Sequence, residues 1–259
     1  MNLKRNETNQ GEGKMKTNGI KLIFSVFLAL ILAGCGTSGS DGGSGGQKSI
    51  SKGKITTKTT TSITVNATQF STTSADIVTE DIGGSAESEI VAGMVVKVTS
   101  SDGVVEEIEY DEEMEGPIEV VISAAGNDVS FKVLGTIVNV DANTVYGKND
   151  GNNVASVIYR VEDIVMHDVV EVSGFYQMNG SLLATYIEMN GTHPANKEAE
   201  IKGNITGLTV IGTGPAGDYY SFTVLGATIT TDVNTTTEGF PGSVLVEGTY
   251  VEVEGALVG

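Results

Sequence analysis

Few side chains in this chain have the type and spacing needed for covalent or metal chemistry. The 259 residues include two histidines, His167 and His193, and one cysteine, Cys35. Two histidines cannot supply a multi-histidine zinc site, and no motif places His167-Asp168 beside a serine in the geometry of a catalytic triad. The chain has no G-x-S-x-G turn, no phosphate-binding glycine loop followed by lysine and no C-x-x-C pair. We therefore expect no catalytic, cofactor-binding or metal-ligating residue, and no bound cofactor.

Two polar segments offer weaker alternatives. The segment GKNDGNN, residues 147–153, has oxygen-bearing side chains for calcium, but its spacing differs from that of an EF-hand loop, so a polar turn is favoured. The acidic run at residues 106–115 is either a cation-responsive hinge or docking site, or a solvated joint whose charges repel each other. We favour the solvated joint.

Aromatic and acidic pairs suggest two further functions. Phe175-Tyr176 and Tyr219-Tyr220 could stack on a sugar, which would make the chain a carbohydrate-binding module, although strand alternation should turn one residue of each pair inward. Glu171 and Glu252 could serve an enzyme as an acid–base pair. Both are expected to face water from equivalent strands, which favours a surface role without catalysis.

The surroundings of Cys35 indicate export. An apolar run of eleven residues, 22–32, follows Lys14, Lys16 and Lys21, which is the length of a signal-peptide core and too short to span a bilayer. The segment Leu32-Ala33-Gly34-Cys35 resembles the lipobox of bacterial lipoproteins. The resemblance implies cleavage between Gly34 and Cys35 and attachment of lipid to the Cys35 thiol. The alternative is a short buried helix with an incidental cysteine.

These features predict the organisation of the first 50 residues. Residues 1–34 form a signal peptide whose true start is Met15, and residues 35–50 hold the lipidated cysteine and a flexible glycine- and serine-rich tether. We expect an extracytoplasmic protein anchored by lipid to a bacterial membrane; Gly36 favours the outer membrane in a Gram-negative cell. A net charge of −18 argues against nucleic acid as a partner. A protein or a glycan is the expected ligand.

The rest of the chain is repetitive. SFKVLGTIVNVDANT, residues 130–144, matches SFTVLGATITTDVNT, residues 221–235, at eight of fifteen positions without a gap. VEVSG at 170–174 matches VEVEG at 251–255, and weaker matches precede both. We predict three tandem modules at 51–110, 115–192 and 198–259, called modules 1, 2 and 3 below.

Each module is predicted to be a small β-barrel. Val129, Phe131 and Val133 alternate on one strand face, and the buried face changes beyond Gly135, where we expect a bulge or a barrel corner. The segments DANT and DVNT are expected to form turns, and the Asn179-Gly180 and Asp102-Gly103 dipeptides to form hairpins. The predicted class is all-β, with barrels that resemble oligonucleotide/oligosaccharide-binding (OB) folds.

The order of these motifs resembles the bacterial repeat family known as domain of unknown function 5666. Members are typically exported, often as lipoproteins with several copies, and the family implies no activity. Module 2 carries the pattern best, through Gly116, Ile118, Phe131, Val133, Gly135, Asp141, Thr144, Val170, Glu171, Val172, Gly174, Gly180, Leu182, Ala184 and Ile187. Module 3 departs from it, since it lacks the final G-x-L-x-A-x-x-I strand. We expect an incomplete sequence, or an open edge that something else fills.

Overall fold

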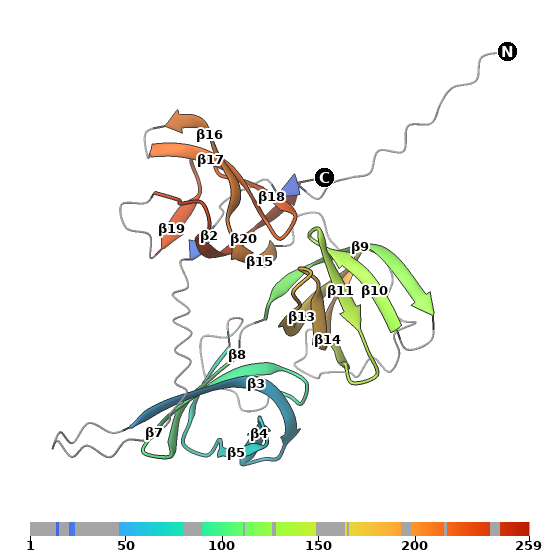
Figure 1. The fold of residues 1–259 in the computed structure, drawn as a ribbon, viewed down its shortest axis with the longest axis vertical. Helices are drawn as coiled ribbons and strands as arrows, with labels where there is room; N and C mark the ends of the chain where they lie inside the picture. Colours follow the sequence, from blue (N-terminus) through green and yellow to red (C-terminus); the bar gives the residue numbers. More distant parts are fainter. Residues whose placement is uncertain are drawn as a thin grey trace.

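The chain was analysed as a computed structural model that describes residues 14–15, 21–23, 47–79, 90–110, 112–125, 128–148, 164, 166–192, 198–214, 217–238 and 244–258. The elements in these ranges are all β-strands (Figure 1), which confirms the predicted all-β class. None of these ranges contains a helix long and apolar enough to cross a membrane.

Module 2 is a closed five-stranded barrel. Its strands pair in the circle β9–β10–β11–β14–β13–β9, and a short strand, β12, lies parallel to β14. The side chains of Phe131, Val133, Val138 and Ile187 are fully buried inside, which confirms the predicted alternation and the change of face. The strands are β9 (Met114–Ala125), β10 (Asp128–Val133), β11 (Thr136–Val140), β12 (Val145–Lys148), β13 (Asp168–Tyr176) and β14 (Leu182–Thr192).

Module 1 is a more open, six-stranded sheet. Its order is β5-β4-β3-β7-β8-β6, and its core includes Ile55, Ile63 and Ile108. Tyr186, from β14 of module 2, packs into the same core. The first strand of module 1 begins at Lys48. The strands are β3 (Lys48–Lys58), β4 (Ser62–Val65), β5 (Thr68–Ser71), β6 (Asp76–Thr79), β7 (Val95–Ser101) and β8 (Val104–Tyr110).

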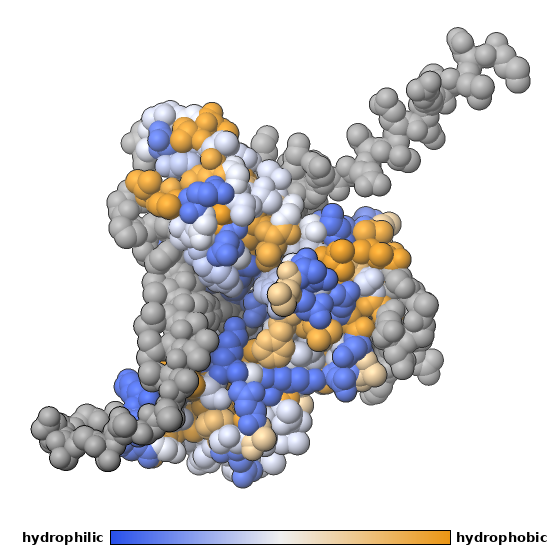
Figure 2. Space-filling view, viewed as in Figure 1, coloured by the Kyte–Doolittle hydropathy of each residue, from blue (hydrophilic) through white to orange (hydrophobic). Residues whose placement is uncertain are grey.

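Module 3 repeats the strand order of module 2 with one substitution. The path β15-β20-β1-β18-β17-β16 follows the circle β9-β13-β14-β11-β10-β9: β15 and β16 take the two pairings of β9, and β1 and β2 together stand where module 2 has β14. At the outer end, β16 presents Val210 and Ile211 to solvent at 58% and 53% exposure, where Figure 2 shows hydrophobic surface. The strands are β15 (Glu198–Asn204), β16 (Thr206–Gly214), β17 (Gly217–Val224), β18 (Ala227–Thr230), β19 (Thr236–Glu238), β20 (Tyr250–Val258), β1 (Lys14–Met15) and β2 (Lys21–Ile23).

The glycine shared by the repeats forms a tight turn, not a bulge or barrel corner. Leu134 and Gly135 have φ values of 47° and 84°, between paired Val133 and Thr136. Two consecutive residues of positive φ are the mark of a two-residue type I′ hairpin. Leu225-Gly226 repeats this turn in module 3 and Asn66-Ala67 in module 1. The buried face changes because the chain reverses there, so the predicted bulge is wrong and the predicted change of face is right.

The other predicted turns are present. In DANT, the Asp141 carboxylate accepts from the Asn143 amide at 2.7 Å and the Thr144 hydroxyl accepts from the Asp141 amide at 3.1 Å; DVNT repeats both bonds. Asp102-Gly103 joins β7 to β8 with φ values of 51° and 80°. The hairpin at Gly180 also forms, through a longer loop in which the Gly180 amide donates to Gln177.

Modules 2 and 3 are joined through both backbone and core. Strand β9 pairs with β15 as well as with its own barrel, through Met114 opposite Ile201 and Glu115 opposite Glu200. The two type I′ turns also meet, and the Thr136 hydroxyl donates to the Leu225 carbonyl at 3.1 Å. One hydrophobic core cluster contains residues of both modules. The sheet is therefore continuous from β14 to β20, and this sheet positions the candidate site.

Candidate functional site

A row of glutamates crosses the sheet that joins modules 2 and 3. Each of five adjacent strands carries one glutamate directly opposite the next. Opposed residues on neighbouring strands share a face at about 4.5–5.5 Å between Cβ atoms, where like charges destabilise the pairing. Such a row therefore needs a compensating charge or proton. We call these residues the acidic row: Glu188 of β14, Glu171 of β13, Glu115 of β9, Glu200 of β15 and Glu254 of β20.

The predicted exposure of Glu171 and Glu252 is wrong. Both side chains are buried, each with 5% of its surface exposed. They do point away from the barrel interior, as the alternation with Val170 and Val172 requires. The outer face of this sheet is itself covered, because Tyr186 on the same face inserts into the core of module 1. A side chain that points away from the interior of this barrel is therefore still buried here, and does not reach solvent.

Lys202 is the buried cation of this face. Its side chain is 3% exposed, and its ammonium lies 2.5 Å from a Glu200 carboxylate oxygen. The same ammonium donates to the Glu112 carbonyl at 2.7 Å, and Lys202 is opposite Glu252 on β20. A buried ammonium among several carboxylates offsets their repulsion, and here it also links β15 to the segment that leads into β9.

Module 1 resolves the same repulsion differently. Its VVKV segment places Lys97 where module 2 has Glu171, and Lys97 lies opposite Glu109 on β8 and forms an ion pair with it. In module 2 the equivalent opposed pair is Glu171 and Glu188. The Tyr186 hydroxyl donates to Glu188 at 2.7 Å, which supplies a hydrogen bond in place of a charge. Among the described strands, the row of directly opposed glutamates thus belongs to modules 2 and 3.

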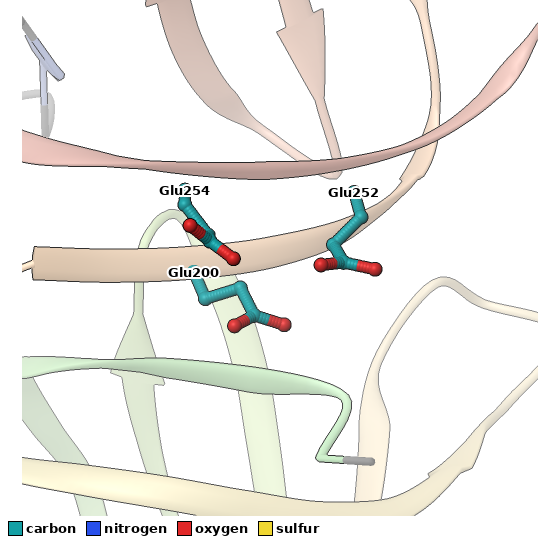
Figure 3. A group of neighbouring side chains, drawn as sticks. All are labelled: Glu200, Glu252 and Glu254. Carbon is teal, nitrogen blue, oxygen red and sulfur yellow. The ribbon is translucent and has the colours of Figure 1, made fainter. Parts of the chain in front are cut away.

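Three carboxylates of this face lie close enough to share a cation. Glu200, Glu252 and Glu254 each offer an oxygen within 4.8 Å of the other two, from neighbouring strands β15 and β20 (Figure 3). Carboxylate oxygens are the ligands that calcium and magnesium prefer. Lys202 forms an ion pair with one of the three, so part of their charge is already compensated within the protein. The expectation from sequence named no metal-ligating residue, and this cluster was not anticipated.

Buried tyrosines surround the acidic residues. Burial raises the pKa of the Tyr186 hydroxyl, and the adjacent Glu188 raises it further. Burial also raises the pKa of Tyr110, helped by Glu112 and Glu171, and the pKa of Tyr176 and Tyr250, both helped by Glu113. These hydroxyls stay protonated at physiological pH; the Tyr186 hydroxyl donates to the Glu188 carboxylate and the Tyr176 hydroxyl to the Glu113 carbonyl. They cannot serve as general bases there.

The acidic run between modules 1 and 2 is not a solvated joint along its whole length. Glu112 and Glu113 are 4% and 8% exposed, and the Glu113 amide donates to the Val172 carbonyl. The Glu113 carboxylate lies 3.3 Å from Lys52 of module 1. The first half of the run does face solvent on β8, where the Glu106 side chain is 46% exposed. The prediction of a solvated joint whose charges repel each other is therefore wrong for Glu112 and Glu113, which are packed between modules.

Replacing Glu113 by glutamine tests the electrostatics of this joint. Burial raises the pKa of the Glu113 carboxyl, and Lys52 opposes that rise only in part. A carboxyl whose pKa is higher when folded stabilises the fold below its unfolded pKa of about 4.3, and this contribution is lost as pH rises through the folded pKa. We expect Glu113→Gln to match the wild type near pH 4 and to have the higher free energy of unfolding at pH 7–8. Urea unfolding across this pH range measures the difference, and a variant less stable at pH 8 would contradict it.

The structure does not bring Glu171 and Glu252 together as an acid–base pair. They lie on β13 and β20, with β9 and β15 between them. Three strand spacings of about 4.8 Å separate their backbones by about 14 Å. Carboxylate pairs in glycoside hydrolysis lie about 5–9.5 Å apart. The separation does not favour the two-carboxylate enzyme.

The remaining predicted residues are dispersed. His167 lies in a turn: its side chain is exposed, its φ is 76° and its backbone amide donates to the Ile118 carbonyl, as the Gly248 amide donates to the Ile205 carbonyl in module 3. Phe175 is 43% exposed, whereas Tyr176 and Tyr220 pack against the core. His193, residues 149–153, Gly34, Cys35 and Gly36 lie outside the described residues.

One sequence signal could have located the acidic row. Glutamates alternate with apolar residues in VEV (170–172), MEG (114–116) and EAEI (198–201). Their alternation places them on one face of each strand, but their opposition follows from the pairing of β9 with β15. Sequence periodicity does not specify that pairing.

The comparison with protein families agrees with the repeats. The model of the family described as Domain of unknown function (DUF5666) matches residues 115–188 and 202–259. These two segments cover modules 2 and 3 and more than half of the chain. No curated protein and no solved structure gives a significant match. With two matched copies, one of them a closed barrel, this chain belongs to the domain of unknown function 5666 family.

Proposed function

We propose that this chain is a lipid-anchored extracytoplasmic lipoprotein whose tandem β-barrels act as a non-catalytic binding or cell-envelope structural module. The observation that carries the proposal is the segment Leu32-Ala33-Gly34-Cys35, directly behind three lysines and an apolar run of signal-peptide length. The only cysteine of the chain stands at the position where the lipobox resemblance requires a free thiol.

The chemistry of the site supports a non-catalytic role. The most acidic face of modules 2 and 3 is largely buried, and its tyrosines have pKa values raised by burial. Lys202 forms an ion pair with Glu200 and donates to a backbone carbonyl, which is a structural arrangement. The net charge of −18 keeps the protein away from nucleic acid, and lipid attachment would hold it at a membrane that its own charge repels.

The strength of the anchor follows from the number of acyl chains. A single chain gives marginal, reversible binding, whereas two or more chains hold a protein on a bilayer. Diacylglycerol on Cys35, with a further chain on its new amino group in cells that add one, meets this requirement. In a Gram-negative cell, Gly36 after the lipidated cysteine favours the outer membrane.

The test is a comparison of the wild type with Cys35→Ala in intact bacteria. We expect the wild type to fractionate with membranes and to show a mass that lacks residues 1–34 and carries acyl chains. We expect Cys35→Ala to keep the unprocessed mass, because the lipid acceptor is gone. A wild-type chain that keeps residues 1–34 and has an unmodified thiol would overturn the proposal.

A further inference from the structure

The final strand position of module 3 is held by a segment from the opposite end of the chain. In module 2 this position is β14, which runs antiparallel to β13 and parallel to β11 and β12. In module 3, β2 runs antiparallel to β20 and parallel to β19, and β1 runs antiparallel to β20 and parallel to β18. All four pairings have the direction of their module 2 counterparts.

The register agrees as well as the direction. In module 2, Ile187 lies opposite Val172 on one side and Tyr146 on the other. In module 3, Leu22 lies opposite Val253 and Thr237, which are the residues equivalent to Val172 and Tyr146. Register is set separately by each neighbouring strand, so agreement on both sides identifies this as the β14 position of module 3.

The same agreement holds at the other end of the position. Met15 lies opposite Leu257 and Ile229, as Leu182 lies opposite Tyr176 and Val138 in module 2. Two separate short strands thus meet the register of one continuous β14. We call the position between β20 and the pair β18 and β19 the strand slot.

The slot has a defined chemistry. Val253 of β20 and Ile229 of β18 beside it are fully buried, so an occupant needs apolar residues at alternate positions. Leu182 and Ile187 fulfil this in module 2, where both are fully buried. The β20 edge also carries Glu252 and Glu254, and the residue opposite Glu254 in this chain is Lys21. The slot therefore favours an occupant with both apolar and basic residues.

We infer that the strand slot of module 3 is a strand-acceptor site of the mature protein that binds an extended polypeptide segment with both apolar and basic residues. The inference rests on the proposed function, because removal of residues 1–34 takes β1 and β2 away. An unpaired strand edge presents a row of backbone N–H and C=O groups to pairing by another chain. Strand addition to such an edge gives affinity through the main chain and specificity through alternate side chains.

The test uses a synthetic peptide of residues 14–23, KMKTNGIKLI, with a fluorescent label. Its binding is measured by anisotropy on residues 35–259 carrying Cys35→Ser, after circular dichroism has shown the β-structure of the full chain. We expect saturable binding. The full chain with Cys35→Ala, which keeps β1 and β2 in the slot, is the matched control and should bind the peptide at least about tenfold more weakly.

Two variant peptides separate strand addition from simple attraction of charge. The Leu22→Pro peptide loses an amide hydrogen, and because β2 lies between β19 and β20, each of its amides faces one neighbour or the other. We expect it to bind about tenfold or more weakly, whereas Leu22→Val should bind like the parent peptide. Lys21→Glu should also weaken binding, by an amount that shrinks at high salt.

Three results would overturn the inference. They are absence of binding to folded residues 35–259, equal binding of the Leu22→Pro peptide, and dimerisation of residues 35–259 that competes with the peptide, which would make a second copy the occupant. Failure of the proposed function is read separately, from the mass of Cys35 in the cell-derived protein. If the chain is never acylated but residues 35–259 bind the peptide, the strand slot is a binding site. Only the proposed removal of residues 1–34 is then wrong.

Discussion

Gly135→Ala should lower the free energy of unfolding by about 3 kcal/mol, a large effect for one methyl group. A Cβ at residue 135 would lie 2.7 Å from the Gly226 carbonyl carbon and 2.9 Å from its oxygen. Backbone atoms cannot move aside as a flexible side chain can, so the two hairpin turns must separate. The positive φ of 84° adds strain of about 1–2 kcal/mol for any residue with a Cβ, and the overpacking adds about 1–3 kcal/mol.

Gly180→Ala is the matched control for this prediction. Gly180 has a φ of 82°, almost the same as Gly135, but a Cβ there would meet nothing within 4 Å. Its expected loss is therefore the strain alone, about 1–2 kcal/mol. Urea unfolding of both variants measures the difference, which reports the contact between modules 2 and 3. Equal losses would show that the two turns do not touch in solution.

Lys202→Met should be the most damaging change on the acidic face. It removes the ammonium that lies against Glu200 and the Glu112 carbonyl, and leaves buried carboxylates without that compensation. Removing one partner of a buried ion pair costs about 3–5 kcal/mol. We expect a loss of this size in urea unfolding at pH 7, with the loss falling as pH is lowered and the carboxylates take up protons.

Two further variants distinguish lost charge from lost packing. Lys202→Arg keeps the charge and should recover a large part of the stability. The double variant Lys202→Met with Glu200→Met replaces the pair by apolar side chains, and buried pairs replaced in this way are often neutral or more stable. A single variant that loses less than about 1 kcal/mol would show that the ammonium does not compensate the acidic row.

The local structure was largely predictable because short-range rules set it. Alternation of Val129, Phe131 and Val133 gives strand faces, and Asp141 and Asp232 give side-chain-capped turns. The change of buried face at Gly135 was correctly predicted, but both a bulge and a two-residue hairpin produce such a change. Only the pairing of Val133 with Thr136 distinguishes the hairpin from the bulge.

The acidic face was not predictable for a different reason. Burial of Glu171 and Glu252 depends on contacts between modules. When each repeat is considered alone, the outer face of its barrel is predicted to be exposed to solvent. The pairing of Glu115 with Glu200 joins residues from separate modules, and Tyr186 leaves its own barrel for the core of module 1. Likewise, an open edge in module 3 was one of two expectations, but nothing in the periodicity of residues 14–23 indicates that β1 and β2 pair with that edge.

The hydrogen bonds between β9 and β15 affect how modules 2 and 3 would meet a partner. Domains joined by a linker alone reorient independently, and a ligand that spans them must restrict that freedom on binding. Here the two barrels share a sheet, so equivalent surfaces on them are held at one separation and one angle. A partner with two matching epitopes would then bind both without the entropic cost of aligning them.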